Sequence, residues 1–435
     1  MGGKMRYTSG FQLKFVVIVF LLGMVFGMIK ISYADDTLKQ EIEGLKARIE
    51  QLEARMLKQD KEVEENKEIN ESLAKIKGAF EGLTIQAGAT FVVQGTHNAN
   101  ADSLSHPKED VFDGSYSVDL ALEKSFQDTG KAFLHLEAGK GAGVEDELKV
   151  FSNVNRDASN SENRLELTEA YYEHYLKLIP LTLTFGKLDP TVYIDDNAYA
   201  NDETSQFLGR CFRNSPVIEF PDNSAGIRLG FSPDEPLEFN FVAFDADSDW
   251  EDIFDGIFLA GQVNFKPKLL GGEGNYRLIG WLNDRNHIKW LEQTKDKEEG
   301  YGFGISFDQG LTNDLGLFLR YGWQNPKVYL NSTSNFSLEQ SYSLGGQLKG
   351  NLWGRNDDVV ALAFGQIFPS DDYKKADVAR RAKLENHLEC YYNYRVNEHL
   401  SLSPNLQVIW DPYGKDAANG DSTIVVGGLR GQVNF

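Results

Sequence analysis

The sequence is poor in cysteine, in basic side chains and in long apolar runs. Its two cysteines among 435 residues, Cys211 and Cys390, build no disulfide framework, and we expect both thiols to be free or buried. Acidic side chains outnumber basic ones, 65 to 44, which disfavours nucleic-acid binding because such binding needs a basic face. Beyond residue 30 no apolar run reaches the roughly 20 residues of a membrane helix. These shortages exclude a disulfide-stapled domain, a nucleic-acid-binding protein and a bundle of membrane helices.

Sequence motifs of catalysis are also missing. There is no P-loop, no nucleophile elbow and no zinc-protease helix. The seven histidines show no metal-ligand spacing. Acid pairs such as Asp195 and Glu203 resemble glycosidase carboxylates, but such pairs are expected by chance in so acidic a chain. We therefore expect no enzymatic activity, no cofactor and no metal ion.

The first 34 residues are predicted to be a signal peptide. Basic residues precede an apolar run from Phe15 to Ile29, and Ser32-Tyr33-Ala34 offers a small-residue cleavage site. The alternative is an uncleaved anchor helix, but Lys30 ends the apolar run early and favours cleavage. Cleavage would remove four basic and no acidic side chains and change the formal net charge from −21 to −25.

Residues 35–80 carry a heptad pattern that predicts a periplasmic coiled coil. Apolar residues recur in alternating steps of four and three, with Ile or Met at position a and Leu at position d. The seam consists of Leu38, Ile42, Leu45, Ile49, Leu52 and Met56. Ile at a with Leu at d favours two strands, whereas Gln59, Asn66 and Asn70 dilute the seam and leave the number open. The alternative is a single charged helix that lies over the rest of the protein.

From Leu83 onward the chain has the alternation of amphipathic strands. The clearest example is Tyr301 to Trp323, whose two halves form a hairpin around a polar turn at 309–314. In each half apolar residues occupy one face, and Gly, Ser, Asp or Arg occupy the other. On the polar face, Asp308 and Arg320 are candidate lumen residues if the strands belong to a barrel. The apolar face meets either the core of a β-sandwich or lipid.

The polar faces and the connections favour lipid. Lys, Glu, Arg, Asn and Gln dominate the faces opposite the apolar ones, and short turns at 309–314, 355–358 and 397–399 alternate with long polar loops. About 350 residues at about 22 per strand and connection give about 16 strands. We expect an all-β fold, a transmembrane antiparallel β-barrel of about 16 strands over residues 81–435, preceded by the α-helical coiled coil. A secreted multi-domain β-sandwich protein is the alternative.

The segment from Lys187 to Asn214 is too long and too mixed for a tight turn, and loops of this kind are often functional. Folded into a barrel, it would place acids and arginines at a narrowing of the pore. The candidate constriction residues are Asp195, Asp196, Asn201, Asp202, Glu203, Gln206, Arg210 and Arg213. If Gln206 to Arg213 is helical, then Gln206, Arg210 and Arg213 share one face. The alternative is a surface loop whose charges stay solvated.

Four stretches carry a family resemblance. They are Tyr193 to Leu208 (YIDDNAYANDETSQFL), Gly274 to Trp281 (GNYRLIGW), Gly302 to Trp323, and Tyr391 to Gln407. Together they resemble the carbohydrate-selective porin (OprB) family, in the family's order and over about Leu83 to Phe435. The resemblance implies a 16-stranded outer-membrane porin, usually trimeric, through which sugars and other small solutes diffuse. It also implies a constriction formed by a loop inside the lumen, a role that falls on residues 193–213.

Two further expectations concern the ends of the chain. Phe435 resembles the terminal aromatic residue that the outer-membrane assembly machinery reads. Plain members of the family lack the heptad segment, so a periplasmic or peptidoglycan contact through it is a separate expectation. We therefore predict an outer-membrane porin for carbohydrates and other small hydrophilic solutes, embedded in outer-membrane lipid as a homotrimer. The alternatives are a cation-preferring general porin, as the acidity suggests, and a structural envelope protein whose coiled coil spaces or assembles the outer membrane.

Overall fold

The computed structural model describes residues 36–101, 108–158, 163–233, 236–253, 255–269, 271–330, 336–420 and 422–435. The predicted signal peptide, residues 1–34, lies outside them. The chain divides into two compact units at the Glu81–Gly82 boundary, and each is described by itself. None of the helices in the described ranges combines the length and the apolar character needed to cross a membrane.

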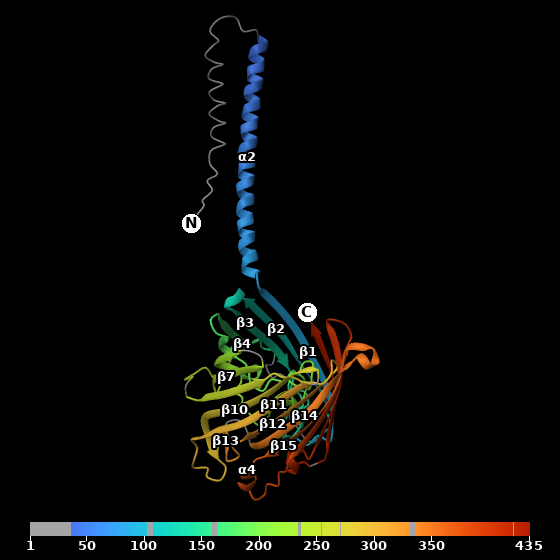
Figure 1. Ribbon diagram of the computed structural model, residues 1–435. Helices are drawn as coiled ribbons and strands as arrows, with labels where there is room; N and C mark the ends of the chain where they lie inside the picture. The colour runs from blue at the N-terminus through green and yellow to red at the C-terminus, as the bar shows by residue number, and fades with distance from the viewer. Residues whose placement is uncertain are drawn as a thin grey trace. The chain divides into compact units, whose positions relative to one another are not determined.

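The first unit contains one long helix, α2 (Asp36–Phe80) (Figure 1). Its sequence is rich in Glu, Lys, Leu and Ala, which favour helix, and its 45 residues extend roughly 67 Å at about 1.5 Å per residue. The helix predicted from the heptad pattern is therefore confirmed. Its seam residues Ile42, Leu45, Ile49, Leu52 and Met56 are all exposed in the single chain. Association of the helix with a second copy stays a prediction.

The second unit is built of strands with a few short helices. The strands are β1 (Leu83–His97), β2 (Phe112–Ser125), β3 (Gly130–Lys140), β4 (Glu166–Leu176), β5 (Leu181–Leu188), β6 (Ser224–Phe231), β7 (Leu237–Asp245), β8 (Ile257–Phe265), β9 (Lys268–Leu269), β10 (Gly272–Lys289), β11 (Glu298–Gly310), β12 (Leu315–Gln324), β13 (Val328–Leu330), β14 (Leu338–Gly350), β15 (Arg355–Pro369), β16 (Glu385–Arg395), β17 (Leu400–Trp410) and β18 (Ile424–Asn434). The short helices are η1 (Gln127–Thr129), η2 (Glu145–Glu147), η3 (Pro190–Val192), α3 (Arg210–Arg213), η4 (Asn351–Trp353), α4 (Asp371–Lys375) and η5 (Pro412–Lys415).

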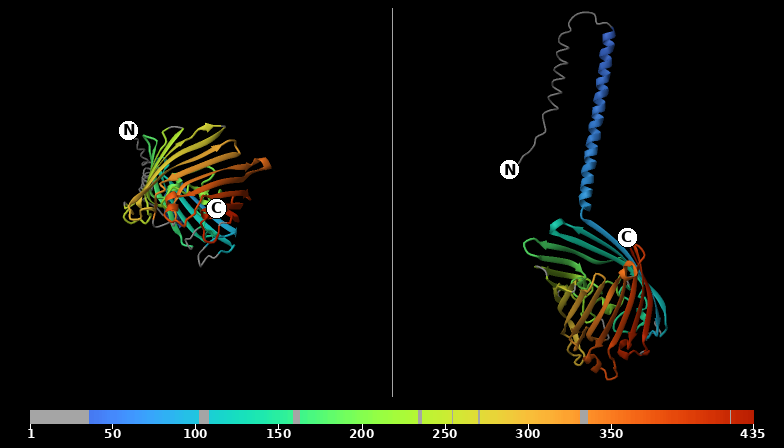
Figure 2. Two further views of the ribbon diagram at one scale, coloured as in Figure 1. Left: turned by 90° about the horizontal axis from the view of Figure 1, so that it is seen from below. Right: turned by 45° about the vertical axis from the view of Figure 1, so that its right-hand side comes forward.

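The strands form a closed antiparallel barrel (Figure 2). Each long strand pairs with the next one in sequence, and β1 closes the ring by pairing with β18 from Gly88↔Asn434 to His97↔Val425. Two of the 18 strands in the described ranges, β9 and β13, are two and three residues long and pair with β10. The other 16 form the wall, which confirms the predicted 16-stranded barrel.

The distribution of side chains is the reverse of that in a soluble sandwich. In the hairpin β11–β12, Tyr301 and Phe303 are 47% and 48% exposed, whereas Asp308 and Arg320 are 2% and 1% exposed. Exposed apolar residues recur around the wall, among them Phe91, Ile227, Phe241, Leu278, Leu362 and Leu406. Buried polar residues alternate with them, among them Gln94, Thr184, Gln262, Arg277, Glu389 and Gln407. An apolar outside and a polar inside suit a barrel that faces lipid.

Short and long connections alternate as expected, with one correction. The turn predicted at 355–358 is wrong, because these residues begin β15 and the chain turns at 351–354. Gly354 takes a left-handed conformation there (φ +75°), which glycine adopts without steric cost. The polar residues that suggested a turn instead hold the start of β15, where Arg355 pairs with Asp358 at 2.5 Å. The longest connection between strands, residues 189–223 between β5 and β6, returns into the barrel.

Candidate functional site

The connection 189–223 enters the barrel directly after β5. Asp189 accepts a hydrogen bond from the backbone N–H of Thr191 (2.8 Å) and so caps η3. The segment then contacts inward-facing side chains of β8, β11, β12, β16 and β18, none of which is a neighbour of β5 in the wall. A segment that reaches all of these strands lies inside the ring.

A buried ion pair attaches the segment to β12. The Nε of Arg320 lies 3.1 Å from Oδ1 of Asp195, and the Asp195 carboxylate also accepts the backbone N–H of Ser215 (2.6 Å). Arg320 donates in addition to the carbonyl oxygens of Phe212 (2.6 Å) and Asp195 (2.9 Å). A buried guanidinium with this many acceptors is well satisfied, so the pair fixes the position of the segment.

A second ionic network attaches the same segment to β10 and β11. Arg277 donates to Asp196 (2.7 Å) and to Asp308 (2.6 Å), so one guanidinium joins a loop carboxylate to a wall carboxylate. Asn275 donates to the other oxygen of Asp308 (2.7 Å). The Asn197 amide reaches Ser306 on β11 at 3.2 Å. The first half of the segment is thus attached to the wall through both consecutive aspartates, Asp195 to β12 and Asp196 to β10.

Side chains from the opposite wall bind the backbone of the second half. Glu389 on β16 accepts the N–H groups of Leu208 (2.7 Å) and Gly209 (2.8 Å). Arg430 on β18 donates to the carbonyl oxygens of Glu203 and Gln206, both at 2.7 Å. A Cβ at position 209 would lie 2.8 Å from Oε2 of Glu389, so any larger residue here would displace this carboxylate.

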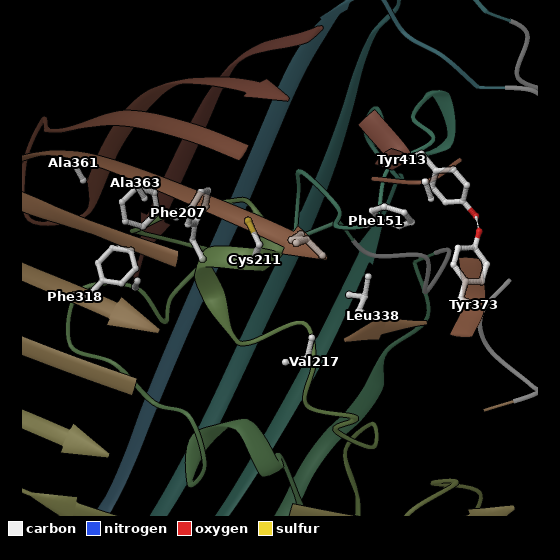
Figure 3. Close-up of a cluster of buried hydrophobic side chains, with 14 of the residues drawn as sticks. Phe151, Phe207, Cys211, Val217, Phe318, Leu338, Ala361, Ala363, Tyr373 and Tyr413 are labelled. Atoms are coloured by element: carbon white, nitrogen blue, oxygen red, sulfur yellow. Dashed lines mark hydrogen bonds between the residues drawn. The ribbon is translucent and has the colours of Figure 1, made fainter. Parts of the chain in front are cut away.

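An apolar cluster completes the attachment (Figure 3). Phe207 and Cys211 of the segment point to the strands that carry Phe318 and Ala363. The Phe207 ring packs edge-on against Tyr391 of β16, with 5.0 Å between the ring centroids. Cys211 is buried here as a free thiol, and Cys390 is also free. Apolar contacts inside a polar lumen occur where the segment and the wall exclude water from each other.

The structure separates the sequence-predicted residues into two groups. Besides the residues of the two ionic networks, Asn201 accepts from Arg320 (3.4 Å), and Asp202 caps Thr204 (2.8 Å). Glu203 pairs with Arg213 (2.7 Å), and Gln206 accepts the N–H of Asn201 (2.6 Å). The shared helical face does not form, because α3 covers only residues 210–213 and Gln206 folds back on the turn before it. Arg210 differs from all of these.

Arg210 and Arg156 present guanidinium groups to water. Both side chains are exposed, and within the described ranges neither guanidinium takes part in a hydrogen bond or ion pair. Their backbones run side by side, since Arg156 N–H donates to Leu208 (2.8 Å) and Arg210 N–H donates to Asn153 (2.9 Å). Their positive charges repel each other. Arg210 also lines a cavity of about 540 Å³ together with Glu219 and several aromatic rings.

Carboxylates gather along the inner wall of β2, β3 and β4. Asp119 and Glu169 lie 3.0 Å and 3.9 Å from the two ring nitrogens of His135, and these side chains are partly exposed. Asp157, from the connection between β3 and β4, accepts a hydrogen bond from Ser117 on β2 (3.0 Å). Burial, followed by the charge of Glu203, raises the pKa of Asp157 to about 8. The inner wall of β2 to β4 is therefore rich in carboxylates, of which those around His135 are partly exposed.

Sequence reasoning missed the wall residues that hold the segment. Arg277, Glu389 and Arg430 sit on strands whose polar faces were expected to be lined by water, yet each is buried by contact with the segment. In the sequence, these residues differ from their neighbours only by a charge on the polar face of a strand. That charge does not reveal which of the many charged wall residues contacts the inward segment.

Comparison with known proteins places the chain in a family. A model described as "Carbohydrate-selective porin, OprB family" matches residues 108–435. The chain belongs to this family. The porin is 27% identical to an uncharacterised protein of Aquifex aeolicus (strain VF5) over 252 residues, which are 58% of this chain and 66% of that one. It is 26% identical to the Porin AaxA of Chlamydia caviae over 241 residues, 53% of this chain and 49% of that one. The matched regions thus span about half to two thirds of these relatives.

Solved structures support the same fold. The Pseudomonas putida OprB at high pH superposes on this porin with a TM-score of 0.68 at 17% identity, covering 83% of this chain and 96% of that one. The outer membrane channel DcaP of Acinetobacter baumannii gives a TM-score of 0.52 at 12% identity, covering 81% and 97%. Family and fold make the protein an outer-membrane porin.

Proposed function

We propose that this porin lets carbohydrates and other small hydrophilic solutes diffuse through a water-filled lumen that residues 189–223 narrow. The observation that carries the proposal is the double attachment of that segment, through Asp195 to Arg320 and through Asp196 to Arg277. A loop held at both positions occupies one side of the lumen permanently. Solutes then pass between the segment and the acidic wall of β2 to β4.

The cavity beside Arg210 supports a hydroxyl-rich solute. It is lined by the rings of Phe151, Phe220, Tyr329 and Phe336 and by charged or amide groups that include Glu219 and Asn283. Apolar ring faces together with a few donors and acceptors suit small polar ligands, and about 540 Å³ lies within the usual range for such cavities. Because the groups carry both charge signs, a neutral sugar would find partners for its hydroxyls.

The test is a planar-bilayer recording of the full-length protein with mono- and oligosaccharides added to the bath. We expect conductance that falls as a sugar of suitable size occupies the lumen. Absence of conductance would refute the channel itself, whereas conductance that no sugar reduces would refute the carbohydrate preference alone.

A preference for cations is the second candidate, and the acidic wall favours it. Asp119, Glu137 and Asp157 lie near enough to interact electrostatically with one another and with Glu203. Negative charge along a narrow path attracts cations and repels anions. Reversal potentials across a salt gradient decide between the two: strong cation selectivity together with indifference to sugars would establish the cation channel as the main function.

The helix α2 is proposed to lie in the periplasm and to associate with a second or third copy of itself. Its apolar stripe from Ile42 to Met56 is exposed, and burial of such a stripe is what drives coiled-coil formation. The homotrimer, a peptidoglycan contact and the assembly role of Phe435 remain predictions. A mainly structural role in the envelope is the alternative, and it predicts that removal of α2 disturbs the membrane more than it disturbs conductance.

A further inference from the structure

An acidic loop at the end of β7 has the chemistry of a cation site. Residues 245–256 contain six carboxylates and no lysine or arginine. Three of them, Asp245, Asp247 and Asp249, alternate along the chain, and one ligand oxygen from each lies within 4.8 Å of the others. Like charges this close repel each other unless a cation or a shared proton lies between them.

The burial of Asp245 is an independent sign of a ligand. Its side chain is 2% exposed, and one carboxylate oxygen accepts the N–H of Trp250 at 3.4 Å. The other oxygen, Oδ1, is buried without a hydrogen-bond partner, and so is Oδ1 of Asp247. Within the described ranges none of the three aspartates takes part in an ion pair. Burying a carboxylate oxygen without a partner is costly, and a bound cation would remove that cost.

We propose that this loop binds one Ca²⁺ ion through Asp245, Asp247 and Asp249. Calcium takes oxygen ligands at about 2.3–2.6 Å in a flexible geometry, which fits three oxygens that lie within 4.8 Å of one another. Magnesium requires a nearly ideal octahedron at about 2.0–2.1 Å, and zinc favours nitrogen and sulfur ligands. Water and backbone carbonyl groups would supply the remaining positions.

The surrounding charges agree with this assignment. A neighbouring basic side chain, Arg285, donates to the carbonyl oxygen of Ala246 (3.4 Å) and forms no ion pair with the three aspartates. The charge of Asp247 raises the pKa of Asp255, with further contributions from burial and from Asp249. The loop therefore retains uncompensated negative charge beside the three ligands.

The ion would sit at the mouth of the porin. Asp247 and Ser248 line the same cavity as Arg210, and the Ser248 hydroxyl donates to the carbonyl oxygen of Asp222 in the inward segment (3.1 Å). Long loops of outer-membrane barrels face the exterior, and extracellular Ca²⁺ sites bind with a dissociation constant of about 10⁻⁴–10⁻³ M. Bound Ca²⁺ would order this rim and reduce its negative charge, whichever solute the channel passes.

The test uses Tb³⁺ as a luminescent probe on the full-length porin in detergent. The backbone N–H of Trp250 donates to Asp245, so its indole is expected close enough to sensitise Tb³⁺ emission, which added Ca²⁺ should then reduce by displacing Tb³⁺. We expect Asp247→Asn to weaken Tb³⁺ and Ca²⁺ binding at least tenfold. Glu251→Gln, which removes the same charge from the same loop outside the three ligands, should leave binding within twofold. Trp250→Phe should lose most of the emission and keep the Ca²⁺ binding measured by calorimetry.

Three outcomes would overturn the proposal. One is the absence of saturable Ca²⁺ binding near one ion per chain in calorimetry of the unaltered protein, a measurement that no variant's folding can affect. Another is equal loss of binding in Glu251→Gln and Asp247→Asn, which would show a diffuse counter-ion effect. The third is displacement of Tb³⁺ by Mg²⁺ as readily as by Ca²⁺. Heat-modifiable migration on gels checks that each variant forms the barrel.

Discussion

Arg320 and Asp195 form an ion pair inside the barrel, with 3.1 Å between Nε and Oδ1 and both side chains buried. They come from parts of the chain that are 125 residues apart, one from the wall and the other from the inward segment. Both charges are removed from water. Loss of one partner therefore lowers the free energy of unfolding by far more than the intact pair adds to it, because the other charge stays buried without a partner.

Asp195→Asn should therefore loosen the segment and widen the pore. The uncompensated Arg320 should cost about 3–5 kcal/mol in the free energy of unfolding, as in other broken buried pairs. Single-channel conductance should rise, and the temperature at which the barrel loses its compact gel migration should fall. The double variant Asp195→Asn with Arg320→Met should recover part of that stability. Unchanged conductance in both variants would show that the segment does not set the width of the pore.

Arg210 and Arg213 should respond differently to replacement by alanine. Arg210 has no partner among the described residues, so Arg210→Ala should shift the reversal potential toward cation selectivity without loss of stability. Arg213 pairs with Glu203, so Arg213→Ala should shift selectivity in the same direction and also lower stability, by about 1 kcal/mol or more because the pair is largely buried. The measurement is zero-current potential in a KCl gradient. Wild-type selectivity in Arg210→Ala would place that side chain outside the conduction path.

Selectivity should depend on pH through Asp157. Its pKa is raised to about 8, so the carboxyl is mostly neutral at pH 6.5 and mostly ionised at pH 9.5. The added negative charge should increase the ratio of cation to anion permeability as the pH rises through this interval. Asp157→Asn should flatten that part of the profile and leave the low-pH selectivity as in wild type. An equally steep profile in the variant would assign the titration to another group.

Deletion of residues 38–80 should change the mass of the assembly. If the exposed stripe of α2 joins copies of the chain, light scattering should show a smaller or less stable oligomer, while conductance per barrel persists. A milder variant replaces Ile49 by Asn in the seam, with an exposed polar position such as Gln51 replaced by Asn as the control. If the number of chains per assembly is unchanged after the deletion, contacts between the barrels and not α2 would hold the copies together.

The sequence predicts the wall far better than it predicts the lumen. Period-two alternation in Tyr301 to Trp323 and in Leu400 to Trp410 depends on local geometry alone, so the strands and their faces follow from it. The failed turn at 355–358 shows the limit: polar residues marked it, but the left-handed Gly354 sets the real position of the turn.

The role of each charged residue could not be predicted in the same way. Asp195 and Asp196 were identified as pore residues by type and spacing, and in the structure they bind the wall instead of standing free in water. Which charges pair is decided by contacts between distant positions, 125 residues apart for Asp195 and Arg320 and 81 for Asp196 and Arg277, and no local pattern encodes them. The cation site proposed at Asp245 was not predicted from the sequence, because metal ligands were sought among the histidines.

The pairing of β1 with β18 has a kinetic consequence. The first and last strands of the wall are neighbours, so the ring closes only after every intervening strand has been made and delivered. Contacts between such distant residues are slow to form, because the entropy of closing the loop is lost before the pairing is gained. Until that step both strands offer bare hydrogen-bonding edges, which are prone to aggregation. Aggregation of the unfolded chain therefore has to be prevented before it reaches the outer membrane. The pairing of β18 with β1 completes the barrel.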